Sequence, residues 1–207
     1  MNKKVCNLLD NILRIIIVIL ILVKIINLEF EDIGMLVLTF ILTFYNWFLK
    51  KVFKINLNIY SRILLSLLIF LAQCLGTTLN FYDLYDNWDL IVHFISGIVM
   101  FIVGYDIFSS LDKRYCDIKL NKKIKIIFSI LFALSVGSIW EMYEYSVDGI
   151  LNLDTQRTGE LIGRMAIKGT MTDLFSPTIG TLLTVIMFLI ANKKEGKKRS
   201  NLKWKVM

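Results

Sequence analysis

The chain has 207 residues, of which 56% are apolar or aromatic and 20% are charged, and its formal net charge is +7. Soluble globular domains carry about 25% charged residues and a smaller apolar share. The composition therefore excludes a cytosolic enzyme, a disordered protein and a disulfide-stapled secreted module. It predicts an all-α fold, a polytopic transmembrane helical bundle that forms a single integral membrane domain over residues 1–207.

Six apolar runs are long enough to cross a bilayer, which takes about 20 residues of helix. In chain order these runs lie at about 12–29, 33–49, 61–79, 88–108, 124–147 and 172–192, and a basic tail follows at 193–207. We therefore expect about six transmembrane helices.

The connections between these runs alternate in charge. All but four of the 24 Lys and Arg residues lie at the two termini or beside the connections after the second and fourth runs. The four exceptions are Lys24, Arg157, Arg164 and Lys168. By the positive-inside rule this pattern predicts an even number of spans with both termini in the cytoplasm. It also makes the lipid bilayer the expected partner of the positive charge and argues against nucleic acid.

The connection before the sixth run has two notable features. Apolar residues recur at helical spacing within 149–171, which predicts a short interfacial helix. Ser176 followed by Pro177 is a typical way to open a helix, so the sixth helix is expected to begin there. Asp173 would then lie in a turn just before that helix, or in its first turn if Pro177 produces a kink.

Ionisable residues at membrane depth are the most informative feature of the chain, because a charge in hydrocarbon costs at least about 2.5–3.5 kcal/mol. The fourth run places Asp86, Asp89 and His93, the single histidine, on one helical face. The fifth run does the same with Glu141, Glu144 and Asp148. The helical rise puts His93 and Glu141 at a similar depth, about 8–9 Å from the outer ends of their helices.

These residues, with Asp173, predict a polar pocket that opens toward the outer leaflet, and three interpretations of it stay open. The first is a divalent-metal or acid/base site. Its metal ligands would be Asp89, Glu141, Asp148 and Asp173, its catalytic groups His93, Glu141 and Glu144, and its substrate-binding groups Gln73, Asp86 and Arg157. Oxygen ligands with one imidazole suit Mg, Mn or Ca. The substrate would be an envelope lipid or a lipid-linked head group.

The second interpretation is a proton- or cation-coupled small-molecule transporter, because carboxylates near the membrane midplane are typical of transport sites. The third is a non-catalytic network in which His93 hydrogen-bonds a carboxylate and Arg157 or Arg164 neutralises other acids. The chain has no HExxH, GxSxG or CxxC motif and no glycine-rich phosphate loop, so the corresponding chemistries are excluded.

The order and spacing of several motifs resemble those of the YjdF-like bacterial inner-membrane proteins. The motifs are Asp89-x-x-x-His93, Trp140-Glu141-x-x-Glu144 with Asp148, Gln156-Arg157-Thr158-Gly159, and Thr170-Met171-Thr172-Asp173 with Gly180. The same skeleton looks like a distant version of VanZ-like proteins, and it covers about residues 82–185. Lys168-Gly169 stands where the family usually has an acidic residue, and Pro177 where Asn or Asp is usual.

The resemblance implies a multi-pass protein of the bacterial cytoplasmic membrane with a role at the cell envelope. VanZ-like relatives are linked to glycopeptide tolerance. The family gives no agreed reaction, so whether the chain is an enzyme is left to the three interpretations above.

Overall fold

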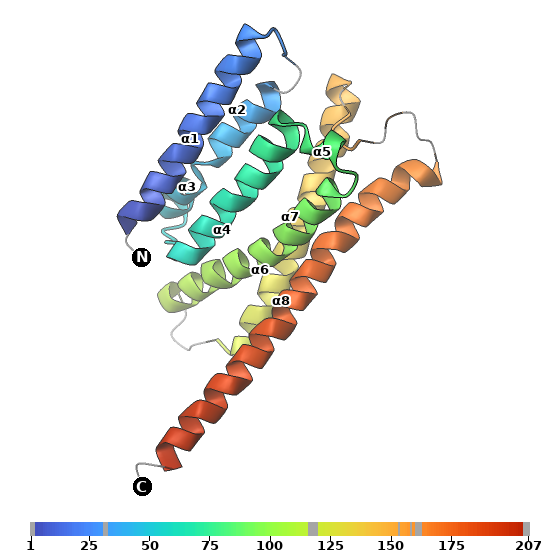
Figure 1. Ribbon diagram of the computed structural model, residues 1–207. Helices are drawn as coiled ribbons and strands as arrows, with labels where there is room; N and C mark the ends of the chain where they lie inside the picture. Colours follow the sequence, from blue (N-terminus) through green and yellow to red (C-terminus); the bar gives the residue numbers. More distant parts are fainter. Residues whose placement is uncertain are drawn as a thin grey trace.

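The computed structural model is a bundle of helices (Figure 1) and describes residues 3–30, 33–115, 120–152, 154–157, 159 and 163–204. Within these residues the chain forms helices and no strand, so the predicted all-α fold is confirmed. The elements are α1 (Lys3–Ile26), α2 (Ile33–Leu42), α3 (Tyr45–Val52), α4 (Ile59–Ile69), the π-helix η1 (Phe70–Thr78), α5 (Phe81–Leu84), α6 (Trp88–Tyr115), α7 (Lys122–Leu151) and α8 (Arg164–Trp204).

Four helices in the described part of the chain are long and apolar enough to cross a membrane. They are Ile59–Thr78, Trp88–Tyr115, Lys122–Leu151 and Ile167–Lys193, and the bent pair of α2 and α3 makes a fifth if it forms one span. They cover the second to sixth apolar runs of the sequence. Helix α1 covers the first run, but it carries five charged residues, Lys3, Lys4, Asp10, Arg14 and Lys24. The bundle is that of a multi-pass membrane protein.

The second predicted span, 33–49, is not one straight helix, because α2 and α3 meet at an angle of 44°. Arg14 of α1 lies at this break and donates hydrogen bonds to the Oγ1 atom and the carbonyl oxygen of Thr43, at 3.1 and 2.9 Å. In a continuous helix that carbonyl would accept from the amide four residues further on. The guanidinium takes the place of this amide, and it also lies 4.2 Å above the ring of Phe44.

Helix α6 lies at the centre of the C-terminal half and packs most extensively against α8 and α7. A Cβ atom on Gly97 would lie 2.0 Å from the carbonyl oxygen of Pro177, and one on Gly180 would lie 2.2 Å from that of Phe94. The backbones of α6 and α8 are therefore in direct contact at both glycines. Thr181 adds a hydrogen bond of 3.1 Å from its Oγ1 to the Gly97 carbonyl.

The expected start of the sixth helix at Ser176-Pro177 is wrong. Helix α8 already begins at Arg164 and runs through Pro177 without interruption. Residues 161–162 of the expected interfacial helix lie outside the described residues, and from Arg164 onward that segment belongs to α8. Ser176 does not cap a helix, because its hydroxyl donates to the carbonyl of Leu90 on α6 at 2.7 Å.

Pro177 has a local consequence within α8. Proline lacks the amide that would donate to the carbonyl four residues earlier. That carbonyl belongs to Asp173. Its oxygen therefore lacks the usual helical hydrogen bond, and it lies next to the Asp173 carboxylate.

The two termini lie at the same end of the bundle (Figure 1). This end, which we call the cationic end, also holds the C-terminal ends of α3 and α6 and the start of α7, with Lys50, Lys51, Lys113, Arg114 and Lys122. The opposite end consists of the turn after α1, α5 and the loop after α7 (Figure 1). The grouping of cations at one end is the arrangement on which the predicted membrane orientation depends.

We expect Gly97→Ala to destabilise the bundle, because the added methyl group collides with backbone rather than with a movable side chain. Overpacking of this kind costs about 1–3 kcal/mol, or a fall in Tm of about 3–10 °C in a chain of this size. Thermal unfolding of the detergent-purified protein measures it. Gly149→Ala in α7 is the matched control, since its Cβ atom would have no neighbour within 4 Å. Equal Tm values for both variants would contradict the proposed contact.

Candidate functional site

His93 lies among acidic side chains at the end of the bundle opposite the cationic end. It is 7% exposed, and its Nε2 atom lies 3.4 Å from Oδ1 of Asp89, one turn earlier on α6. The same nitrogen lies 3.7 Å from Oε1 of Glu141 on α7. The structure thus brings together side chains from the fourth and fifth predicted spans, at the similar depth that their helical positions indicate.

Asp173 adds a carboxylate from a third helix, α8. One ligand atom each from Asp89, His93 and Asp173 lie within 4.8 Å of one another. We call these three residues with Glu141 the acidic cluster. Asp173 reaches it because Ser176, Pro177 and Gly180, in the next two turns of α8, press directly against α6.

Glu141 is 5% exposed, and its Oε1 atom is buried without a hydrogen-bond partner among the described residues. Buried polar atoms are nearly always hydrogen-bonded, and a buried carboxylate needs a proton or a cation nearby. The side chain that can supply a positive charge here is His93, whose Nε2 atom lies 3.7 Å from this oxygen. The cluster is therefore a place where the protein has more buried acceptor oxygens than internal donors.

A polar cavity of about 390 Å³ lies beside the cluster. Asp89 and Glu144 line it, and Glu144 accepts a hydrogen bond of 2.9 Å from Nε1 of Trp140. Gln73 also lines it, from the π-helical segment η1. Its Oε1 atom is buried and has no hydrogen-bond partner in the described part of the chain. π-Helical turns occur often at functional sites, where they redirect a side chain.

Tyr82 and Arg157 also line this cavity. The guanidinium of Arg157 lies 4.7 Å above the Tyr82 ring and forms an ion pair with Asp83. The ring itself is held against Gly76, where a Cβ atom would lie 2.3 Å from it. Burial raises the pKa of Tyr82, and the nearby carboxylates of Asp89 and Glu144 raise it further. Tyr82 therefore keeps its proton and can act as a hydrogen-bond donor in the cavity.

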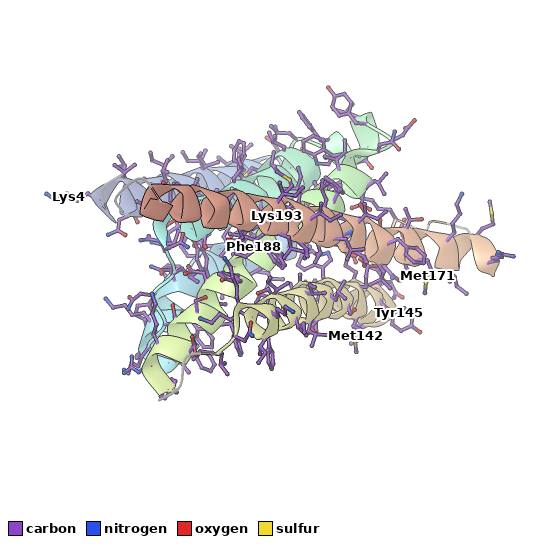
Figure 2. The ribbon with its side chains drawn as sticks, turned by 90° about the horizontal axis from the view of Figure 1, so that it is seen from below. Lys4, Met142, Tyr145, Met171, Phe188 and Lys193 are labelled. Carbon is purple, nitrogen blue, oxygen red and sulfur yellow. The ribbon has the colours of Figure 1, made fainter. Side chains whose placement is uncertain are left out.

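A second cavity, of about 580 Å³, lies between α7 and α8 and has mostly apolar walls. Met142 and Tyr145 on α7 and Met171 on α8 line it, and Figure 2 shows these three residues at the same end of the two helices. All three are exposed, which on a membrane helix means contact with lipid. Glu141 also lines this groove, so the acidic cluster borders both the polar cavity and the apolar groove.

Two of the predicted site residues, Asp148 and Asp86, are brought into neither the acidic cluster nor the polar cavity. Asp148 accepts hydrogen bonds from the amide and hydroxyl of Thr155, at 2.7 and 2.6 Å, and from the amide of Gln156, at 2.9 Å. Its carboxylate therefore holds the loop after α7. Asp86 is exposed and does not line the polar cavity. Gln73 and Arg157, predicted to bind substrate, do line it.

Several residues of the site are not evident from the sequence. In the sequence, Tyr82 is typical of the aromatic residues at a membrane interface, but in the structure it lines the polar cavity. Thr155 and Asn152 enter the lining only because the loop folds back over α7. Trp140 is different, because helical spacing identifies it from the sequence. It lies four residues before Glu144 and therefore on the same helical face.

The fold and this site define a multi-pass membrane protein with a polar cluster at one end of its bundle. Residues 9–194 match the family described as "Predicted membrane protein (DUF2238)", and the chain belongs to this family. An "Uncharacterized protein" of Thermotoga maritima is 25% identical over 138 residues, which are 66% of this chain and 65% of the relative. The chain thus spans just under two thirds of that relative's length. No solved structure matches the chain.

We expect Asp148→Ala to loosen the loop after α7, because three donors lose a charged acceptor. Hydrogen bonds to charged groups contribute about 1.5–3 kcal/mol each, so exchange of the Thr155 and Gln156 amides should accelerate at least about tenfold. Hydrogen–deuterium exchange measures it, and Asp86→Ala is the control at an exposed carboxylate. Unchanged loop exchange together with weaker Mn²⁺ binding would instead support the metal-ligand role predicted for Asp148.

Proposed function

We propose that this protein of the bacterial cytoplasmic membrane binds a divalent cation in the acidic cluster and uses it on an envelope lipid or a lipid-linked head group. The proposal is carried by one observation, the convergence of ligand atoms from Asp89, His93 and Asp173 within 4.8 Å beside the unpartnered oxygen of Glu141. The resemblance to YjdF-like proteins, and more distantly to VanZ-like proteins, supports a role at the cell envelope.

The spread of the ligand atoms fits a bound ion. Mg²⁺ and Ca²⁺ bind oxygen at about 2.0–2.6 Å, so two ligands of one ion lie at most about 4–5 Å apart. Three carboxylates and one imidazole favour Mg²⁺, Mn²⁺ or Ca²⁺ over a structural zinc. Such an ion would also supply the positive charge that the buried oxygen of Glu141 lacks.

The surrounding groups suit hydrolytic or transfer chemistry at that ion. A divalent cation polarises a phosphoryl or carbonyl oxygen and lowers the pKa of a bound water. With His93 serving as a ligand, Glu144 would serve as the acid/base group, and its hydrogen bond from Trp140 orients it. Arg157 and Gln73 would contact the polar part of the substrate.

The apolar groove between α7 and α8 supports a lipid as the substrate. Its walls suit an acyl or isoprenoid chain, and Glu141 lies where the groove meets the acidic cluster. A lipid that entered sideways from the bilayer would thus bring its head group to the proposed ion without leaving the membrane.

The metal proposal predicts that the purified full-length protein binds Mn²⁺, and that Asp173→Asn or His93→Gln weakens this binding at least about tenfold, because each removes a ligand. Calorimetric titration measures it, with the exposed Asp86→Asn as control.

Two results would contradict this prediction. If Mn²⁺, Mg²⁺ and Ca²⁺ all fail to bind and the variants only lower Tm, the cluster is a structural network. If no metal binds but liposomes show a pH-dependent substrate flux that Asp173→Asn abolishes, the protein is a transporter.

The lipid proposal predicts that Ser138→Trp, which fills the apolar groove, prevents crosslinking of a photoactivatable phosphatidylglycerol there and leaves Mn²⁺ affinity within about twofold, because an indole occupies the space of a lipid chain. Ile139→Trp is the matched control, since this neighbour is 63% exposed and does not line the groove. Mass spectrometry of the crosslinked peptides measures it. Equal crosslinking in both variants would exclude the groove as the lipid path.

A further inference from the structure

A large cavity lies at the cationic end, on the other side of the bundle from the acidic cluster. It has a volume of about 940 Å³ and lies between α1, α3 and the start of α4. Its lining carries three cations, Arg14, Lys50 and Arg62, and one acid, Asp10. The break between α2 and α3 places α3 against this space, because the 44° bend directs α3 away from the line of α2.

Arg62 and Asp10 form the buried floor of this cavity. Each is 5% exposed, and the Nη2 atom of Arg62 pairs with the Asp10 carboxylate and with Oδ1 of Asn7. Ser66 donates to the same carboxylate at 2.9 Å. This pair is therefore balanced in charge and held in place. The Nε atom of Arg62, however, is buried without a hydrogen-bond partner among the described residues, so one donor of this guanidinium is not used within them.

The other two cations are not neutralised. Arg14 donates to the hydroxyl and carbonyl of Thr43 and to Oδ1 of Asn11, which are all uncharged. Lys50 is exposed, and no acidic residue lies within ion-pair distance of it in the described part of the chain. Two positive charges without an acidic partner thus face the same cavity, and both attract an anion to it.

Four asparagine side chains in the lining add uncharged hydrogen-bond donors. Asn7 and Asn11 turn their amide oxygens to Arg62 and Arg14, so their amino groups remain to donate. Asn46 and Asn56 add two further amides. Guanidinium, ammonium and amide donors around one space match the acceptor-only oxygens of a phosphate group.

We propose that this cavity binds a phosphate group with two negative charges, as in a phosphomonoester lipid headgroup. The two cations without acidic partners match that charge. With the predicted orientation, the cavity lies at the cytoplasmic surface, where anionic headgroups are found. A smaller basic cavity with Lys51, Lys54 and Arg114 shares Lys50 and Asn56 with it and extends the attraction along the surface.

Titration calorimetry on the detergent-purified full-length protein tests this site with dihexanoyl phosphatidic acid, dihexanoyl phosphatidylcholine and inorganic phosphate. We expect phosphatidic acid to bind at least about tenfold more tightly than phosphatidylcholine, because charge-assisted bonds dominate the contact. Lys50→Glu should weaken phosphatidic acid binding by a similar factor. Lys113→Glu is the control, an exposed lysine at the same end with the same charge change that does not line the cavity.

The outcomes separate the two sources of the phosphate. Lys50-dependent binding of phosphatidic acid supports a lipid headgroup, and Lys50-dependent binding of inorganic phosphate alone supports a soluble phosphate. Equal affinity for phosphatidic acid and phosphatidylcholine, an equal loss in both lysine variants, or no binding of either phosphate compound would overturn the proposal. Lys50 is exposed, so its variant should keep the Tm of the wild type. Lys50→Glu should leave Mn²⁺ binding unchanged, because Lys50 is not part of the acidic cluster, and this separates the two sites.

Discussion

The direct backbone contact between α6 and α8 is the constraint on which the rest of the C-terminal half depends. Gly97 and Gly180 leave no room for a side chain, and Ser176 and Thr181 hydrogen-bond across the same contact. In a bilayer such contacts replace the hydrophobic effect as the cause of helix association, because lipid is as apolar as the helices. The same contact also places Asp173 of α8 close to His93 of α6. The packing of these two helices therefore determines the geometry of the acidic cluster.

Charged side chains are paired differently at the two ends of the bundle. Near the cationic end, Arg62 and Asp10 neutralise each other, while Arg14 and Lys50 line a cavity without an acid of their own. At the opposite end, acids outnumber cations around His93. Burying a charge costs most free energy when no opposite charge or hydrogen-bond partner compensates for the lost hydration. This difference in unpaired charge is why we propose a cation as the ligand at one end and an anion at the other.

The candidate site could be anticipated in part. Helical spacing places Asp89 and His93 on one face, and helical rise places Glu141 at a similar depth, because both follow from the regular geometry of a single helix. The same reasoning treats Asp148 as equivalent to Glu141, since it lies on the same face of α7. Only the loop, which folds back so that Thr155 bonds to Asp148, distinguishes them.

By itself, the sequence determined the all-helical membrane fold, the apolar segments and the asymmetry of charge between their connections, because hydrophobicity and charge act locally along the chain. Tertiary structure alone decided the break at Thr43, the uninterrupted course of α8 through Pro177, and the partners of each buried acid. These depend on contacts between distant segments, such as Arg14 with Thr43 and Ser176 with Leu90. A hydrogen bond between two helices can replace a backbone hydrogen bond that is missing within one of them. The local sequence of either helix does not show that such a bond will form.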